Sequence, residues 1–521
     1  MAMTPSVYGP DRRRATQSTA DAGAVRRCLP YHPGMRLPRA VPWMLVFLLC
    51  LGWNALDLIQ RRADLGTGWV VGWDDNFYLA WGRSLAVDGD WRFDNDIAFA
   101  ASVSPGGAEV LRAHLAERTP AGRVPNKYPC GVGVLAVPFL LVTRVVLDVA
   151  ASAGLTTRSD PFSSLYVLAF IASNVFWAAV GLATAWTLLR REYSPGVAGP
   201  ALLVGAIGLP LGYYIWFEPV MAHATGFGIV TLFIACVVGW ADRVTVAHDG
   251  ATGWPGWAVL MGLLLGAAVL VRFTNVVMAL VPVVVGLAVR PSRRHDGSWV
   301  AVMLTSLGLA AVGTLIGFMP QLVAWKVVYG TFLVDSYVGE TLTAWPRHLV
   351  SILFGARNGL FSWTPLALIA VTGLVIGVRN RVLCRAGLVV LAATAWIYGG
   401  WQMYWLGHSF GMRGFVDASF FLLVGLAEVF MRAQRIPSRA VARAGRIVVA
   451  LLVVWTLHLI VCYRAQIQPH GEPLAVRPLF TEWRRWTRQI YADTGFRMLV
   501  RASHPGARPV DGPRRPGEDR R

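Results

Sequence analysis

Long apolar runs alternate with shorter polar segments along most of the chain. Many of the runs have the length that a helix needs to cross a bilayer. We expect apolar helices at about 41–60, 131–150, 163–189, 197–216, 224–241, 256–272, 274–290, 300–325, 364–379, 383–400, 415–432 and 446–463. Two long polar insertions, about 61–130 and 326–363, interrupt the series. The pattern predicts an all-α polytopic membrane protein with about 11–12 transmembrane helices and two large outer loops.

Arginines at the ends of the apolar runs predict the orientation. Several lie within the first 27 residues and place the N-terminus in the cytoplasm, so both long insertions are expected outside. Strict alternation would put Arg190 and Arg191 outside as well. The run 131–150 contains Arg144 and Asp148, so we expect it to lie in the membrane interface instead of crossing. Arg190 and Arg191 are then cytoplasmic, and about eleven spans remain.

Three parts follow from this organisation. Residues 1–38 are rich in Arg, Pro and Ser and are expected to form a disordered cytoplasmic tail, not a cleavable signal peptide. Residues 39–463 form the membrane module, and 464–521 a polar C-terminal tail.

Composition supports a membrane protein and argues against other classes. The 521 residues are 55% hydrophobic and only 15% charged. The net charge of +19 comes from arginines near the ends of apolar runs, and no recognition module is present, so we expect no nucleic-acid partner. The six cysteines are scattered without a CxxC pair and are expected to be apolar filling residues.

An acidic pair, Asp74 and Asp75, opens the first insertion in the sequence GWDDNFY. In a loop the two carboxylates would point in different directions and could take two roles, such as general base and orienting group. The structural alternative is that they cap a helix beginning near Asn76. A cap needs only one acid, so we favour a functional role.

Three cations are placed to meet an anion on the outer side. Lys127 ends the first insertion and is one of only two lysines, but a lysine at a helix start can also snorkel toward the interface. Arg272 lies between two apolar runs, where an arginine is costly unless it meets an anion or water. Arg413 lies in a glycine-rich outer connector.

Four further polar residues on the expected outer side are weaker candidates. Glu218 and His223 interrupt two apolar runs, and a solvated turn with an interface histidine explains them equally well. Arg357 closes the second insertion, and His408 lies in the same connector as Arg413.

Taken together, three motifs resemble the GT-C glycosyltransferases, a group that includes protein O-mannosyltransferases and aminoarabinose transferases. WDDNFY opens the first outer loop, KYPCG ends it, and GLLLGAAVLVRFTN is similar to the glycine-rich helix of the family that ends in Arg. The number of spans before the second outer loop also fits. In KYPCG, Cys130 stands where the family often has a second proline, which puts the role of Lys127 in doubt.

The resemblance implies a function on the outer face of a bacterial cytoplasmic membrane. A sugar would move with inversion from a polyprenyl-phosphate donor to a hydroxyl on a glycan, lipid or protein. Asp74 or Asp75 would act as the base, and Lys127, Arg272 and Arg413 would hold the donor phosphate. Some members use a divalent cation, but the acidic pair alone offers too few ligands to define a metal site.

Other classes stay open at this point. A transporter or flippase would place charges at mid-membrane and have two related halves. A lipid-linked-sugar ligase of another fold would share the donor without needing the aspartate pair. A non-catalytic protein of envelope-glycan assembly is the third alternative.

Overall fold

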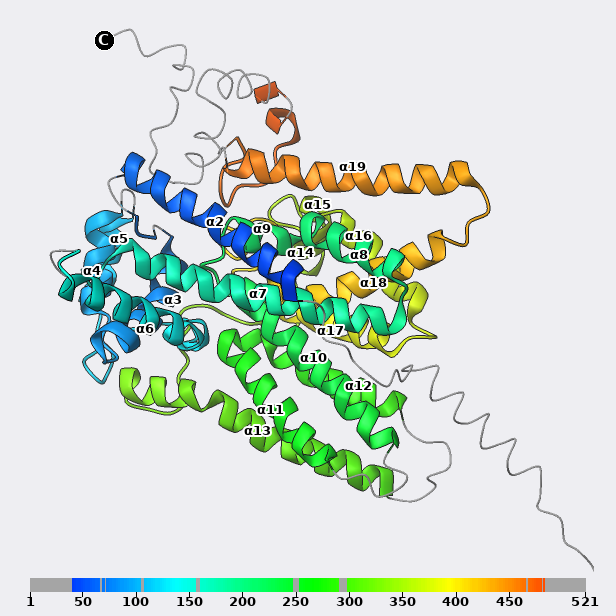
Figure 1. Cartoon of the computed structure of the whole chain (residues 1–521), viewed down its shortest axis with the longest axis horizontal. Coiled ribbons are helices and arrows are strands. Elements are labelled where there is room, and N and C mark those ends of the chain that lie inside the picture. The colour runs from blue at the N-terminus through cyan, green and yellow to red at the C-terminus, as the bar shows by residue number, and fades with distance from the viewer. Residues whose placement is uncertain are drawn as a thin grey trace, which may run out of the picture.

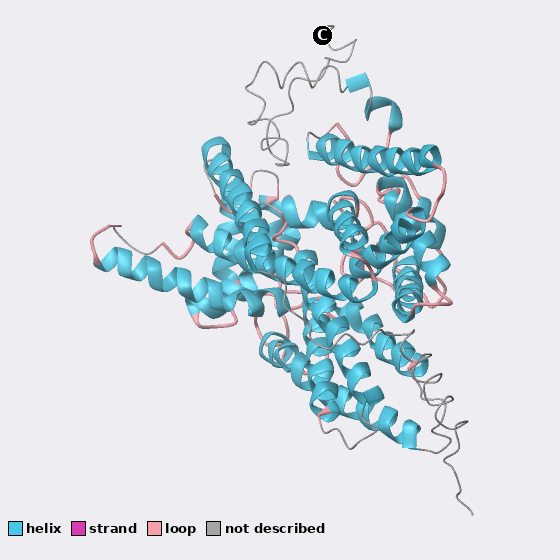
Figure 2. Ribbon diagram, turned by 45° about the vertical axis from the view of Figure 1, so that its right-hand side comes forward, coloured by secondary structure: helices cyan, strands magenta, loops and turns pink. Residues whose placement is uncertain are grey.

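The computed structural model describes residues 40–65, 68–70, 72–104, 107–155, 160–246, 253–289, 298–464, 467–479 and 481–482. The expected tail 1–38, its arginines and most of the segment 464–521 lie outside these residues. The described part is built from helices and loops, without any strand (Figures 1 and 2). One isolated bridge joins Leu342 to Trp401.

The helices follow the apolar runs and also occupy the polar insertions. Their bounds are α2 (Ala40–Leu65), α3 (Trp73–Arg83), α4 (Asp94–Val103), α5 (Ala108–Ala116), α6 (Gly131–Ser152), α7 (Ser164–Glu192), α8 (Pro195–Gly208), α9 (Pro210–Trp216), α10 (His223–Val246), α11 (Trp254–Val271), α12 (Leu280–Ala288), α13 (Ser298–Tyr329), α14 (Leu349–Phe354), α15 (Leu360–Trp363), α16 (Leu366–Gly377), α17 (Val382–Gly400), α18 (Ser419–Ala433) and α19 (Arg439–Arg464). Short π and 3₁₀ turns, Ser84–Asp88, Phe273–Ala279 and Arg413–Phe415, join some of them.

Eight of the described helices are long and apolar enough to cross a membrane: α2, α6, α7, α10, α11, α13, α17 and α19. A ninth span results if α8 and α9 are counted together across their 71° bend. The predicted all-α, multi-pass membrane protein is confirmed, although fewer of the described helices are long enough to span than the 11–12 expected. The run 131–150 forms α6, which is long and apolar enough to span the membrane. Length and composition do not place it in the bilayer, and its expected interfacial position stays a prediction.

The bundle has an enclosed centre and an exposed rim. α10 is almost wholly buried, and it packs against α7 and α11. α2, α13 and α19 lie at the periphery with few of their residues buried, as expected of helices that face lipid (Figure 1).

Glycines allow α11 and α13 to pack backbone against backbone. A Cβ atom added to Gly262 would lie 2.0 Å from the carbonyl oxygen of Ala310, and one added to Gly266 would lie 2.4 Å from that of Thr314. Gly313 approaches α11 as closely from the other side. The small residues four apart therefore serve helix packing, as their spacing suggests.

Replacing Gly262 by Val is expected to lower the stability of the folded protein by several kcal/mol, because the added side chain must push two backbones apart. The matched control is Gly308→Val on α13, where an added Cβ meets nothing within 4 Å. Thermal unfolding in detergent compares the two variants. Equal melting temperatures would show that the close approach does not stabilise the fold.

Different groups of charged residues lie at the two ends of the bundle. At one end Arg381 pairs with Glu192 at 2.8 Å and with Glu428 at 3.0 Å, which ties α7, α17 and α18 together. The two polar insertions and the connector after α17 meet at the other end, around Tyr398 and Trp401, a helix length away along α17. Arg381 and the cavity-lining connectors therefore lie at opposite ends of the bundle, and the membrane face that each end meets stays a prediction.

Candidate functional site

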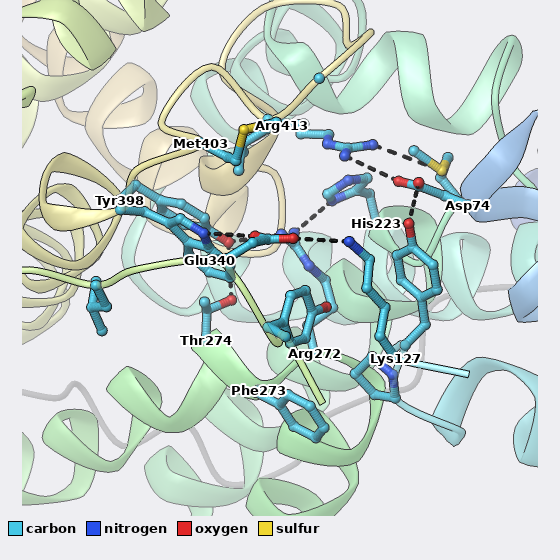
Figure 3. Close-up of a pocket in the computed structure, with 18 of the residues that line it drawn as sticks. Asp74, Lys127, His223, Arg272, Phe273, Thr274, Glu340, Tyr398, Met403 and Arg413 are labelled. Carbon is cyan, nitrogen blue, oxygen red and sulfur yellow. Dashed lines mark hydrogen bonds and ion pairs between the residues drawn. The ribbon is translucent and has the colours of Figure 1, made fainter. Parts of the chain in front are cut away.

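A cavity of about 560 Å³ lies at the end of the bundle where the connectors meet (Figure 3). Both insertions, the end of α11 and the connector after α17 contribute side chains to it. Five of the candidate residues line it together: Asp74, Lys127, His223, Arg272 and Arg413. Of the other candidates, Asp75, Glu218, Arg357 and His408 are not among the lining residues.

Asp74 lies in the first turn of α3 and points into the cavity between two donors. The hydroxyl of Tyr128 donates to Oδ1, and Nη2 of Arg413 donates to Oδ2 at 3.0 Å (Figure 3). Burial, together with the charge of Asp74, raises the pKa of Tyr128 well above its ordinary value, so this hydroxyl stays a donor. The carboxylate is thus held in a fixed orientation.

Asp75 turns the other way. A Cβ atom added to Gly72 would lie 2.5 Å from Oδ2 of Asp75, so this carboxylate is folded back over the start of its own helix. There it meets the positive end of the helix dipole. The two acids of the pair are therefore separated, with one facing the cavity and the other facing the helix terminus.

Arg413 is the second partner of Asp74. It lies in the 3₁₀ turn Arg413–Phe415, just before α18 begins. Burial is the largest single effect and works against its charge, but Asp74 and the surrounding tyrosine hydroxyls together outweigh burial and raise the pKa of Arg413. The guanidinium therefore stays charged inside the cavity.

Arg272 ends α11 and is fixed by three neighbours. Its Nη2 donates to the hydroxyl of Tyr398 at 2.7 Å, and its Nη1 contacts Oδ1 of Asp417 at 3.2 Å and Nδ1 of His223 at 2.6 Å. An arginine can only donate, so we assign Nδ1 of His223 as the acceptor and its proton to Nε2. The longer contact of Nδ1 with Oδ1 of Asp417, at 3.4 Å, is then not a hydrogen bond.

Asp417 is the buried counter-ion of Arg272. Its Oδ2 accepts a hydrogen bond from Asn275 at 2.9 Å. Burial is the largest single effect and works against its charge, but Arg272 and the neighbouring polar side chains, Asn275 among them, together outweigh burial and hold the pKa of Asp417 below the usual value. The pair therefore stays charged while one side of the guanidinium faces the cavity.

Lys127 is joined to the second insertion. Its Nζ lies 2.8 Å from Oε1 of Glu340, and the indole N–H of Trp401 donates to Oε2 at 2.8 Å. The ammonium also lies 5.3 Å from the centre of the Tyr337 ring. Sequence reasoning did not find Glu340, because 213 positions separate it from Lys127 and no spacing links them.

The remaining candidates have structural contacts away from the cavity. Glu218 accepts a hydrogen bond from the hydroxyl of Tyr213 at 3.0 Å, and burial raises its pKa. The guanidinium of Arg357 lies 4.3 Å from the centre of the Trp405 ring. His408 lies near the last described residues, packed against Gly471.

The cavity pairs each cation with an acid: Lys127 with Glu340, Arg272 with Asp417 and Arg413 with Asp74. Lysine and arginine keep further donors after such a pairing, so an anion can bind beside the acids. Within the described residues, no three His, Cys, Asp or Glu side chains gather as metal ligands would. The arrangement can hold an anion next to a carboxylate that is able to accept a proton.

No family model matches this chain, and no curated protein matches it. Among solved structures, the chain is similar to the crystal structure of ArnT from Cupriavidus metallidurans in the apo state. The match has a TM-score of 0.47 and 15% sequence identity, and it covers 89% of this chain and 78% of that one.

Proposed function

We propose that this protein is a GT-C-type glycosyltransferase of a bacterial cytoplasmic membrane. On the outer face it would transfer a sugar, with inversion, from a polyprenyl-phosphate donor to a hydroxyl of a glycan, lipid or protein. The observation that carries the proposal is the convergence of Asp74, Lys127, Arg272 and Arg413 from separate connectors into one cavity. The motifs WDDNFY, KYPCG and GLLLGAAVLVRFTN support the same assignment.

Asp74 is the proposed general base. It would take the proton of the acceptor hydroxyl as that oxygen attacks the anomeric carbon of the sugar. A carboxylate has about four lone-pair positions, so it can keep its bonds from Tyr128 and Arg413 and still accept a proton. These two donors act as positioning residues.

Lys127 and Arg272 are the proposed phosphate ligands. The bond between the anomeric carbon and the phosphate oxygen breaks with its electron pair on the oxygen, so negative charge grows on the leaving polyprenyl phosphate. Fixed cations beside that oxygen lower the barrier. Arg272 is already fixed by Asp417 and Tyr398, so it need not reorganise during the reaction.

The position of the cavity supports transfer over transport. A transporter would bind its substrate near mid-membrane between related halves. Here the charged residues that line the cavity lie at one end of the bundle, beyond the last turn of α17.

The experiment that tests the proposal is a transfer assay with the protein in nanodiscs. Labelled polyprenyl-phosphate sugars serve as donors and a membrane extract as acceptor, and both glycosylated product and released polyprenyl phosphate are measured. Equal yields of the two are expected for one donor of the panel. Donor movement between leaflets in liposomes, without any product, would indicate a flippase. A folded protein inactive with the whole panel would favour a non-catalytic role.

Replacing Glu340 by Gln is expected to tighten the binding of polyprenyl phosphate about fivefold. The change removes a negative charge that competes for Lys127, and a partly exposed ion pair contributes up to about 1 kcal/mol. Binding is measured by tryptophan fluorescence in nanodiscs. Asp335→Asn is the matched control, because it removes a cavity-lining charge from the same insertion. Weaker binding by Glu340→Gln alone would mean that Glu340 positions Lys127 for the phosphate.

A further inference from the structure

The second insertion carries an apolar surface outside any long helix. Six large apolar side chains between residues 332 and 350 are each more than half exposed. We call them the apolar patch: Phe332, Leu333, Val338, Leu342, Trp345 and Val350. In water, so much exposed apolar area on one segment would be unfavourable, and such surfaces mark interaction sites.

Hydrogen bonds place this segment at the end of a membrane-spanning helix. The backbone N–H of Thr343 donates to the carbonyl of Gly400 at 2.8 Å, and that of His348 donates to Gly399 at 2.8 Å. Both carbonyls belong to the last turn of α17, one of the helices long enough to span. The segment therefore lies at the height where α17 leaves the hydrocarbon.

The apolar patch is continuous with the exposed side of α17. Trp396 of α17 is about half exposed, which for a spanning helix means contact with lipid. Its indole N–H donates to the carbonyl of Ala344 at 3.0 Å, and its ring meets that of Trp345 edge-to-face at 5.5 Å. Paired tryptophans at a helix end are typical of the interfacial belt.

Charge at the same place fits a lipid headgroup. Arg347 is exposed between Trp345 and Val350, where it can reach a lipid phosphate. The backbone of residues 332–348 is not helical, so it cannot lie within the hydrocarbon, and the interface is the depth at which it can remain hydrated.

We propose that residues 332–350 form an anchor in the outer membrane interface, with a phospholipid bilayer as its partner. Leu342 belongs to the apolar patch and also lines the cavity. The anchor therefore holds the mouth of the cavity at the bilayer surface. This consequence rests on the proposed function: a polyprenyl-phosphate donor could enter the cavity without leaving the membrane.

Spin labels measure the depth of the anchor directly. Cys50, Cys130, Cys236, Cys384 and Cys462 are buried, so a Cys28→Ser background allows one nitroxide at Val338→Cys or Trp345→Cys. In phospholipid nanodiscs, both nitroxides are expected to collide more with oxygen than with a water-soluble nickel chelate. The matched control is Asp335→Cys, an exposed position of the same segment that lines the polar cavity, where the chelate should dominate.

Two outcomes would overturn the anchor. One is chelate access at Val338 and Trp345 equal to that at Asp335. The other is broadening of the nitroxide signal that depends on protein concentration, which would show a second copy covering the patch.

A kinetic experiment tests the anchor separately from the proposed function. Val338→Ser combined with Trp345→Ser should raise the KM for a full-length polyprenyl donor several-fold, without changing the KM for a short-chain, water-soluble donor. An equal rise for both donors would contradict the anchor. If wild type transferred no sugar at all while the nitroxides reported burial in lipid, the proposed function would fail and the anchor would stand.

Discussion

Replacing Asp74 by Asn is expected to reduce sugar transfer by about 10²–10⁴-fold while the protein stays folded. An amide cannot take the proton of the acceptor hydroxyl, which is the contribution of a general base. The Asn oxygen can still accept the hydrogen bond from Tyr128, but the Asn amide group then faces Nη2 of Arg413, so a moderate loss of stability is expected as well. Initial rates at saturating donor in nanodiscs measure the effect, and the melting temperature reports folding.

Asp75→Asn is the matched control, because it makes the same chemical change at a carboxylate that turns away from the cavity. It should keep nearly the full rate, and its melting temperature shows how much this carboxylate contributes to the stability of the fold. Loss of transfer in Asp75→Asn alone would make Asp75 the base. Wild-type rates in both variants would leave Asp74 with a purely structural contact to Arg413.

Replacing Arg272 by Gln is expected to lower kcat by about 10²–10³-fold, the effect of removing one fixed donor from a site of developing negative charge. The change also leaves Asp417 as a buried carboxylate without its counter-ion, which costs about 3–5 kcal/mol of stability. Reduced transfer by the single variant could therefore reflect unfolding.

A double variant separates these effects. Adding Asp417→Asn to Arg272→Gln removes the uncompensated charge and should restore most of the melting temperature while transfer stays low. Recovery of both stability and transfer would contradict a role for Arg272 in holding the donor phosphate. It would leave the arginine as a counter-ion for Asp417.

The fold was largely predictable because apolar length and composition determine which segments can cross a membrane. The polar insertions were less predictable. A helix begins at Trp73, so Asp74 and Asp75 both lie in a first turn and not in a loop. The sequence suggested this alternative but could not show which of the two carboxylates would face the cavity.

The expected membrane topology placed the three cations on the same side of the membrane. It did not predict which acids pair with them. Lys127, Arg272 and Arg413 were expected on one face, and they do line one cavity. Glu340 and Asp417 contact them across 213 and 145 positions of sequence, through loops whose course no periodicity records.

The glycine contact between α11 and α13 has a mechanical consequence. With no side chain between their backbones, the two helices should move as a rigid unit. They run parallel, so this unit carries Arg272 and leads into the second insertion at the same end. If Glu340 moves relative to Arg272, the backbone must therefore bend after Tyr329, the last residue of α13. The next residue, Gly330, has a φ of +87°, a conformation that only glycine adopts without strain, which makes it the natural hinge.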